Sequence, residues 1–142
     1  MICATIYLPK AEWTIYAYIA VTGYYADEIL DKMREIGAGP TALSKAQDNL
    51  LNGHLNTGLT YSSHEERKTV WVVALTSSAQ EFFNTIVHEI RHVSQHIAND
   101  MELDENSEDV CYLSGDIAFE LFPYCRSLLC EHCRGQKTRK IW

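Results

Sequence analysis

The chain has 142 residues, of which 46% are hydrophobic and 22% charged, a balance typical of one globular domain that can bury a core. The formal net charge of −7 argues against a nucleic-acid binder that relies on a broad basic face. Residues 126–142 carry a net +4 and the preceding residues −11, and we expect this basic tail to be solvated rather than bound to phosphate or a partner.

The N-terminal segment MICATIYLPKAEW does not resemble a signal peptide. It lacks a positively charged start, and Lys10 and Glu12 interrupt its apolar run. No stretch approaches the roughly 18 apolar residues of a membrane span. Without a secretory context, an odd number of cysteines indicates reduced thiols or metal ligands; the five are Cys3, Cys111, Cys125, Cys130 and Cys133. We therefore expect a cytoplasmic protein with no membrane partner.

The first half of the chain predicts strands and two helices. Residues 2–9 and 13–21 are rich in β-branched and aromatic residues and predict two strands. Residues 26–36 have apolar residues at helical spacing, and residues 41–52 predict a second, weaker helix.

A hairpin is predicted next, from residues 57–63 and 68–75. The turn between them reads HEERK. It starts like a metal-binding motif but has Lys68 where a second histidine is required, so we interpret it as a solvated turn.

Two helices are predicted to follow. Ser78 is a suitable N-cap and Glu81 completes a capping box, so a helix begins there and runs to about Asn99. After an acidic break, a last helix is expected from about Glu108 to Phe122, ending before Pro123. We predict an α+β fold in one domain over residues 1–142: strands and two helices in 1–76, metal-binding helices in 77–123 and a Cys-rich basic tail in 124–142.

The first of these helices contains the motif HEIRH. Positions i and i+4 share one helix face, so His88 and His92 can bind the same zinc ion. Glu89 lies beside the ion and can act as general base toward an activated water. Arg91 and Ser94 are unusual at their positions, and a surface helix with histidines on its polar side is the alternative interpretation.

A third ligand must come from outside the motif. His96 lies eight residues from His88, about 12 Å along the axis, which is too far for one ion, so we expect it at the rim of the site. The acidic break offers Asp104, Glu105, Glu108 and Asp109, and depth along two antiparallel helices favours Glu108, with Glu105 in reserve. The face of Glu108 continues as an apolar stripe expected to pack on the motif helix: Cys111, Tyr112, Gly115, Phe119 and Phe122.

HEIRH followed by SEDVCYLSGDI resembles the gluzincin branch of zinc metallopeptidases. Residues 57–120 also resemble small zincin-like proteins carried by phages and mobile elements of gut bacteria. The resemblance implies a minimal zincin-like domain, with a small antiparallel or mixed sheet and an active-site helix packed against a C-terminal helix. By position it implies zinc ligands at His88, His92 and Glu108, and a general base at Glu89.

Two further groups of residues have candidate roles. Tyr112, His96 and Tyr61 are candidates to stabilise an oxyanion, although Tyr112 reads more simply as a core residue. The segment CRSLLCEHC could form a second, structural zinc clip, but its ligands lie within nine residues and reduced, ordinary cysteines are the expectation; the clip would use Cys125, Cys130, His132 and Cys133.

The leading hypothesis is a zinc-dependent metallopeptidase that hydrolyses a peptide or protein substrate. A catalytically silent zincin-like module that binds a partner protein is the first alternative, and a phage structural or accessory protein is the second. An extended substrate is expected to bind beside an exposed edge strand, for which residues 69–75 are the candidate.

Overall fold

The computed structural model describes residues 1–51 and 58–134. Its elements, in chain order, are β1 (Ile2–Leu8), β2 (Trp13–Val21), the 3-10 turn η1 (Gly23–Tyr25), α1 (Ala26–Glu35), α2 (Pro40–Leu51), β3 (Gly58–Ser63), β4 (Lys68–Ala74), α3 (Ala79–Asp100), α4 (Glu108–Cys125) and η2 (Arg126–Leu128). The α+β class is confirmed, and each predicted strand and helix forms close to its expected bounds. In the described part of the chain, no helix has the length and apolar character needed to cross a membrane.

The four strands form one mixed sheet in the order β1-β2-β4-β3. β1 pairs antiparallel to β2, β2 pairs parallel to β4, and β3 pairs antiparallel to β4 as the predicted hairpin. β4 therefore lies inside the sheet, and the expectation that residues 69–75 form an edge is wrong. β4 lies between β2 and its own hairpin partner β3, so β3 is the edge strand on this side of the sheet.

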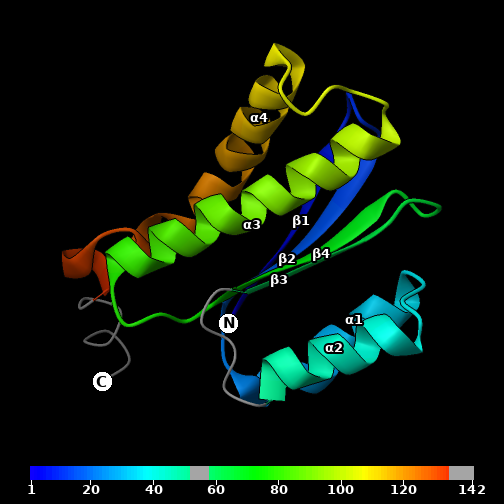
Figure 1. Ribbon diagram of the computed structural model, residues 1–142. Coiled ribbons are helices and arrows are strands. Elements are labelled where there is room, and N and C mark those ends of the chain that lie inside the picture. Colours follow the sequence, from blue (N-terminus) through cyan, green and yellow to red (C-terminus); the bar gives the residue numbers. More distant parts are fainter. Residues whose placement is uncertain (52–57, 135–142) are drawn as a thin grey trace.

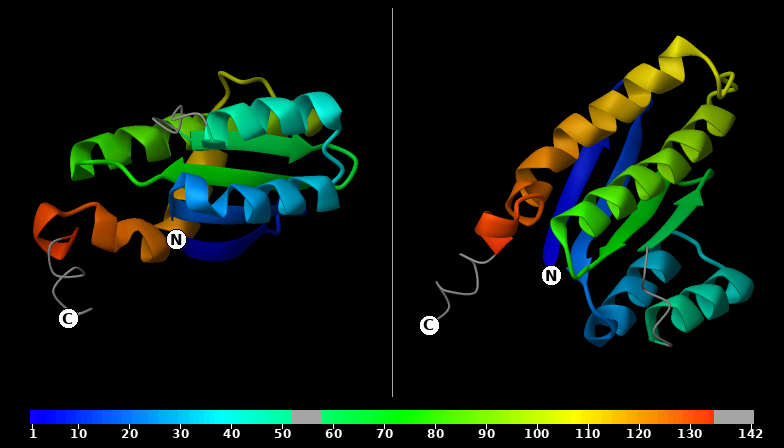
Figure 2. Two further views of the ribbon diagram at one scale, coloured as in Figure 1. Left: turned by 90° about the horizontal axis from the view of Figure 1, so that it is seen from below. Right: turned by 60° about the vertical axis from the view of Figure 1, so that its left-hand side comes forward.

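Helices cover both faces of the sheet (Figure 1). α1 and α2 lie on one face, while α3 and α4 lie on the other, as the two views of Figure 2 also show. A hydrophobic core lies on each face of the sheet, and β4 contributes side chains to both because successive residues of a strand point to opposite faces. Trp71 and Val73 pack toward α3, and Val70 and Val72 pack toward α1 and α2. This explains the continuous apolar run in β4, which is typical of a strand buried on both faces.

A bulge near the end of β2 changes the face to which the strand points. The pairing register shifts between Ile19 and Val21, and Ala20 has a left-handed backbone with φ 60°. Ile19 packs in the core under α3, whereas Val21, two residues on, packs in the core of α1 and α2. The bulge thus turns the chain toward the α1–α2 layer.

The start of α3 follows the predicted cap with one difference. The Ser78 hydroxyl accepts from the backbone N–H of Glu81 at 3.1 Å, as expected of an N-cap. The Glu81 carboxylate accepts from the Ser77 hydroxyl at 2.7 Å, so the reciprocal half of the capping box is replaced by a contact one residue earlier.

α4 packs on α3 with a different face from the one predicted. The stripe from Cys111 to Phe122 is exposed, and Gly115 has open space around it instead of a close helix neighbour. The buried face is the opposite one, formed by Val110, Ile117, Leu121 and Cys125. Ser114 on this side donates to the Ser94 hydroxyl of α3 at 2.9 Å, and Ser94 in turn donates to the carbonyl of Ile90. The buried Ser94 therefore joins the two helices through a hydrogen bond.

The helix also continues past Pro123 to Cys125 instead of ending before it. Proline removes the hydrogen bond that residue 123 would have donated to the carbonyl of Phe119. Because Phe119 lies on the exposed side of α4, its carbonyl can be solvated, and the helix extends for two more residues.

Candidate metal centre

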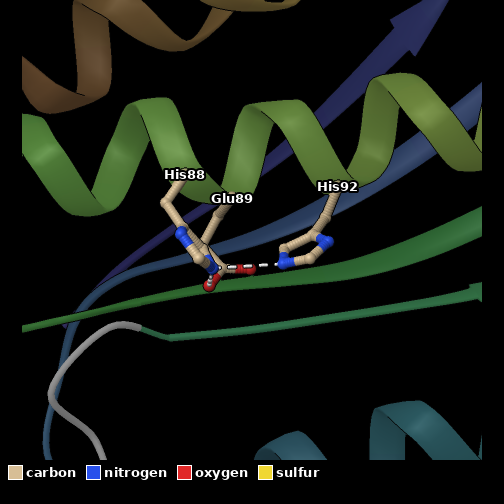
Figure 3. A group of neighbouring side chains, drawn as sticks. All are labelled: His88, Glu89 and His92. Carbon is tan, nitrogen blue, oxygen red and sulfur yellow. Dashed lines mark hydrogen bonds and ion pairs between the residues drawn. The ribbon is translucent and has the colours of Figure 1, made fainter. Parts of the chain in front are cut away.

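His88 and His92 lie one turn apart on the face of α3 that looks toward β3 (Figure 3). Their Nε2 atoms are 3.1 Å apart and the ring centroids 4.8 Å apart. A tetrahedral zinc ion with bonds of about 2.0–2.1 Å places two ligand nitrogens about 3.3 Å apart. Both rings therefore already have the spacing that binding to a single ion requires.

Glu89 lies between these histidines and the sheet. It is 2% exposed, although carboxylates are rarely buried to this degree without partners. Its Oε2 accepts a hydrogen bond from the Thr60 hydroxyl of β3 at 2.5 Å, and its Oε1 lies 3.9 Å from Nε2 of His88. One ligand atom from each of His88, Glu89 and His92 lies within 4.8 Å of the others, so these three residues could hold a metal ion.

Gly58 at the start of β3 allows this close approach of helix and strand. Its φ of +142° is disfavoured for other residues, and an added Cβ would lie 2.2 Å from the Val72 carbonyl oxygen and 3.1 Å from Cγ of Glu89. The Asn49 side chain of α2 donates to the Gly58 carbonyl at 3.2 Å. An open, shallow hollow results between β3 and α3, lined by Gly58, Leu59, Thr60, His88, Glu89 and His92.

His96 continues the row of histidines along α3 but does not belong to the group of three. Its ring centroid is 6.4 Å from that of His92, and its Nδ1 lies 2.7 Å from the Ser62 hydroxyl of β3. Ser62 Oγ is 2.7 Å from Thr69 Oγ1, which accepts from the Trp13 indole N–H at 2.9 Å. A hydrogen-bonded chain thus holds the ring of His96 against β3, outside the group of potential ligands.

Glu108 is not brought to the two histidines. It is exposed in the first turn of α4, and the group of potential ligands among the described residues does not include it. The physical reason is the side of α3 on which α4 packs. Ser94, which contacts α4, lies about 160° around the α3 axis from His92 and about 120° from His88.

The other acidic candidates also lie away from the two histidines. Asp104, Glu105 and Asp109 are exposed in or beside the connection between α3 and α4 and are likewise outside the group. Depth along the helices does not bring these carboxylates to the histidines, because α4 packs on another side of α3.

The candidate oxyanion donors are separated in space. Tyr61 packs against the core of α1 and α2, on the opposite sheet face from Thr60 and Ser62. Tyr112 is 65% exposed on the outward side of α4 and is not a core residue. Of the three candidates, His96 shares the helix face of the histidine pair.

The cysteine-rich segment does not form a second cluster of ligands in the described residues. Cys125 is buried in the core, and burial raises the pKa of its thiol to about 11. Cys130 is exposed, and hydrogen bonds from Cys133 and from the His132 backbone lower the pKa of its thiol. The buried and the exposed thiols thus belong to different environments.

Several residues that shape the centre were not anticipated from the sequence: Gly58, Thr60, Ser62, Thr69 and Trp13. The available signal was the alternation of hydroxyl side chains in GLTYSS, which places Thr60 and Ser62 on one face of a strand. Arg91, the unusual residue of the motif, is exposed.

Comparisons with protein-family models, with curated proteins and with solved structures found no match to this chain.

Proposed function

We propose that this chain is a zinc-dependent hydrolase acting on a peptide bond, with His88 and His92 as metal ligands and Glu89 as general base. The observation that carries the proposal is the 3.1 Å separation of the two Nε2 atoms beside a buried carboxylate. Histidine pairs at this spacing chelate zinc, and a carboxylate beside them has the position needed to move a proton.

When bound, zinc supplies Lewis-acid polarisation of a carbonyl and lowers the pKa of a coordinated water toward neutrality. The protein's part in the reaction falls to Glu89. Thr60 occupies one carboxylate oxygen, so the other is free to accept a proton from the attacking water and to deliver it to the leaving amine. The open hollow beside β3 leaves room for substrate on the same side.

Glu108 has no part in this proposal, because α4 packs on the other side of α3. Catalytic zinc sites usually have three protein ligands. With two, the remaining positions go to solvent and substrate, and we expect weaker zinc binding than a complete site provides.

A second candidate is a metal-binding module without catalysis, in which Glu89 is itself the third ligand. It is favoured by the closeness of Glu89 Oε1 to the histidines. The distance of 3.9 Å is longer than the roughly 3.3 Å between two ligands of one tetrahedral ion, and we therefore prefer the role of base.

Glu89→Gln separates the two candidates. If Glu89 is the base, the variant keeps the wild-type zinc content after dialysis but hydrolyses fluorescein-labelled casein at least about 100-fold more slowly. Loss of zinc from this variant would make Glu89 a ligand, and unchanged hydrolysis would remove it from the reaction.

Matched variants test the ligands in the same assays. His88→Ala and His92→Ala should both lose zinc, whereas His64→Ala, in the HEERK turn, should keep zinc and activity. Glu108→Gln should also keep its zinc; a loss there would restore Glu108 as a ligand. Wild-type protein without zinc after equilibration would overturn the proposal as a whole.

A further inference from the structure

α4 is apolar on two opposite faces. One face is buried against α3 and the sheet, while the other exposes Tyr112, Phe119 and Phe122 by 65%, 76% and 55%. Clustered exposed aromatic side chains mark interaction surfaces. Among the described residues, no other element covers the outward face.

Hollows beside this face provide places for side chains. One of about 250 Å³ lies between Tyr7, Pro9, Leu113 and Phe119, and a neighbouring one of about 300 Å³ lies between Met101, Leu103 and Tyr112. Both are lined by Lys10, Ala11, Leu113 and Asp116, so they form one groove along α4 beside the β1–β2 turn. From Asp109 to Glu120 the groove is about 16 Å long, or three helical turns.

The groove is acidic. Asp109, Asp116 and Glu120 line it, and no described residue forms an ion pair with any of the three. The sequence of α4 contains four acidic residues and no lysine or arginine. Lys10 is the basic residue among those lining the groove. A ligand with basic side chains is therefore complementary to this surface.

A second copy of the chain is a poorer fit through the same face. Antiparallel two-fold pairing of α4 would set Asp109, Asp116 and Glu120 of one copy beside those of the other. Parallel pairing would set them against a flank without basic residues. Like charges brought together in this way destabilise an interface.

We propose that the groove between α4 and the β1–β2 turn binds a basic, amphipathic segment of a partner protein. Large apolar side chains of the segment enter the two hollows and contact Phe119 and Tyr112, while its lysine and arginine side chains pair with Asp109, Asp116 and Glu120. The groove lies on the α4 side of α3, away from the histidine pair, so this interaction is independent of the metal centre.

A pair of synthetic peptides tests the proposal on the full-length protein. Both are 14-residue helix formers with leucine and phenylalanine on one face; one has lysine and arginine on its flanks and the other has glutamate. Fluorescence anisotropy at low salt should show binding of the basic peptide at least about tenfold tighter than of the acidic one, and the binding should weaken as salt rises.

Two double variants of equal net charge provide the control. Asp116→Lys with Glu120→Lys should weaken binding of the basic peptide at least about tenfold, whereas Asp27→Lys with Glu28→Lys on exposed α1 should change it less than about twofold. Phe119→Ala should weaken binding without altering zinc content, which separates this result from the fate of the metal proposal.

Three outcomes would overturn the proposal. Equal weakening by both double variants would mean nonspecific attraction. A dimer in sedimentation that Phe119→Glu dissociates would assign the face to a second copy. Peptide binding that appears only after residues 135–142 are deleted would assign the groove to the chain's own basic tail.

Discussion

The neighbours of His96 determine both its tautomer and the direction in which its pKa shifts. The Trp13 indole can only donate, so the arrangement that gives every proton an acceptor runs from Trp13 to Thr69, to Ser62 and then to Nδ1 of His96. This leaves the ring proton of neutral His96 on Nε2. Burial, followed by the charges of His92 and His64, lowers the pKa of His96 below its usual range.

The lowered pKa of His96 predicts how stability changes with pH in metal-free protein. Above about pH 6.5, His96 is neutral both folded and unfolded; as the pH falls below that value, the unfolded chain takes up a proton that the folded protein resists. The free energy of unfolding should therefore fall between pH 7 and pH 5.5. Urea titrations should show a shallower fall in His96→Gln, and parallel slopes for the two proteins would contradict the prediction.

At the scale of elements, we expect substitution by alanine to change the free energy of unfolding in opposite directions at two glycines, Gly58 and Gly115. Gly58→Ala places a Cβ against the Val72 carbonyl in a backbone conformation that alanine avoids, so β3 must shift and the cost should exceed about 2 kcal/mol. Gly115→Ala in the open interior of α4 should stabilise by about 0.5–1 kcal/mol. Urea unfolding of both variants measures this, and equal effects would refute the assigned backbone roles.

The elements themselves were largely predictable, because alternation and helical spacing are local signals. The strand β4 and the helix α3, with its Ser78 cap, follow directly from such patterns. The packing face of α4 was not predictable in the same way. With apolar residues on both sides, the helix gives no local indication of which side faces α3. Local patterns also do not show on which side of α3 it packs, and the third-ligand prediction at Glu108 depended on both.

At the scale of the whole molecule, zinc should stabilise the fold, because the pair His88 and His92 is positioned only in the native state to hold one ion beside Glu89. Free zinc at about 100 times its Kd adds roughly 2.7 kcal/mol, which corresponds to a rise in Tm of roughly 5–10 °C. Differential scanning fluorimetry should show this rise with zinc and not with magnesium, which prefers oxygen ligands.

The variant carrying both His88→Ala and His92→Ala is the control for that measurement. Its Tm should be the same with zinc and with a chelator. An equal rise in this variant would place the bound zinc elsewhere in the chain.

Strand order was the other feature beyond reach of local patterns. Which strand lies at the edge depends on pairing between β2 and β4, which are far apart in the sequence, and no local pattern specifies such a pairing. The histidine pair, by contrast, was predictable because both residues lie within two turns of one helix.

The insertion of β4 between β2 and β3 also has a consequence for the order of assembly during synthesis. The β1–β2 hairpin can form as soon as it leaves the ribosome, but one edge of β2 has no partner until β4 has been made. Through that interval the nascent chain presents unpaired backbone groups beside apolar side chains, the surface that promotes aggregation. Protection of this edge while residues 22–74 are translated is therefore part of the folding problem of this chain.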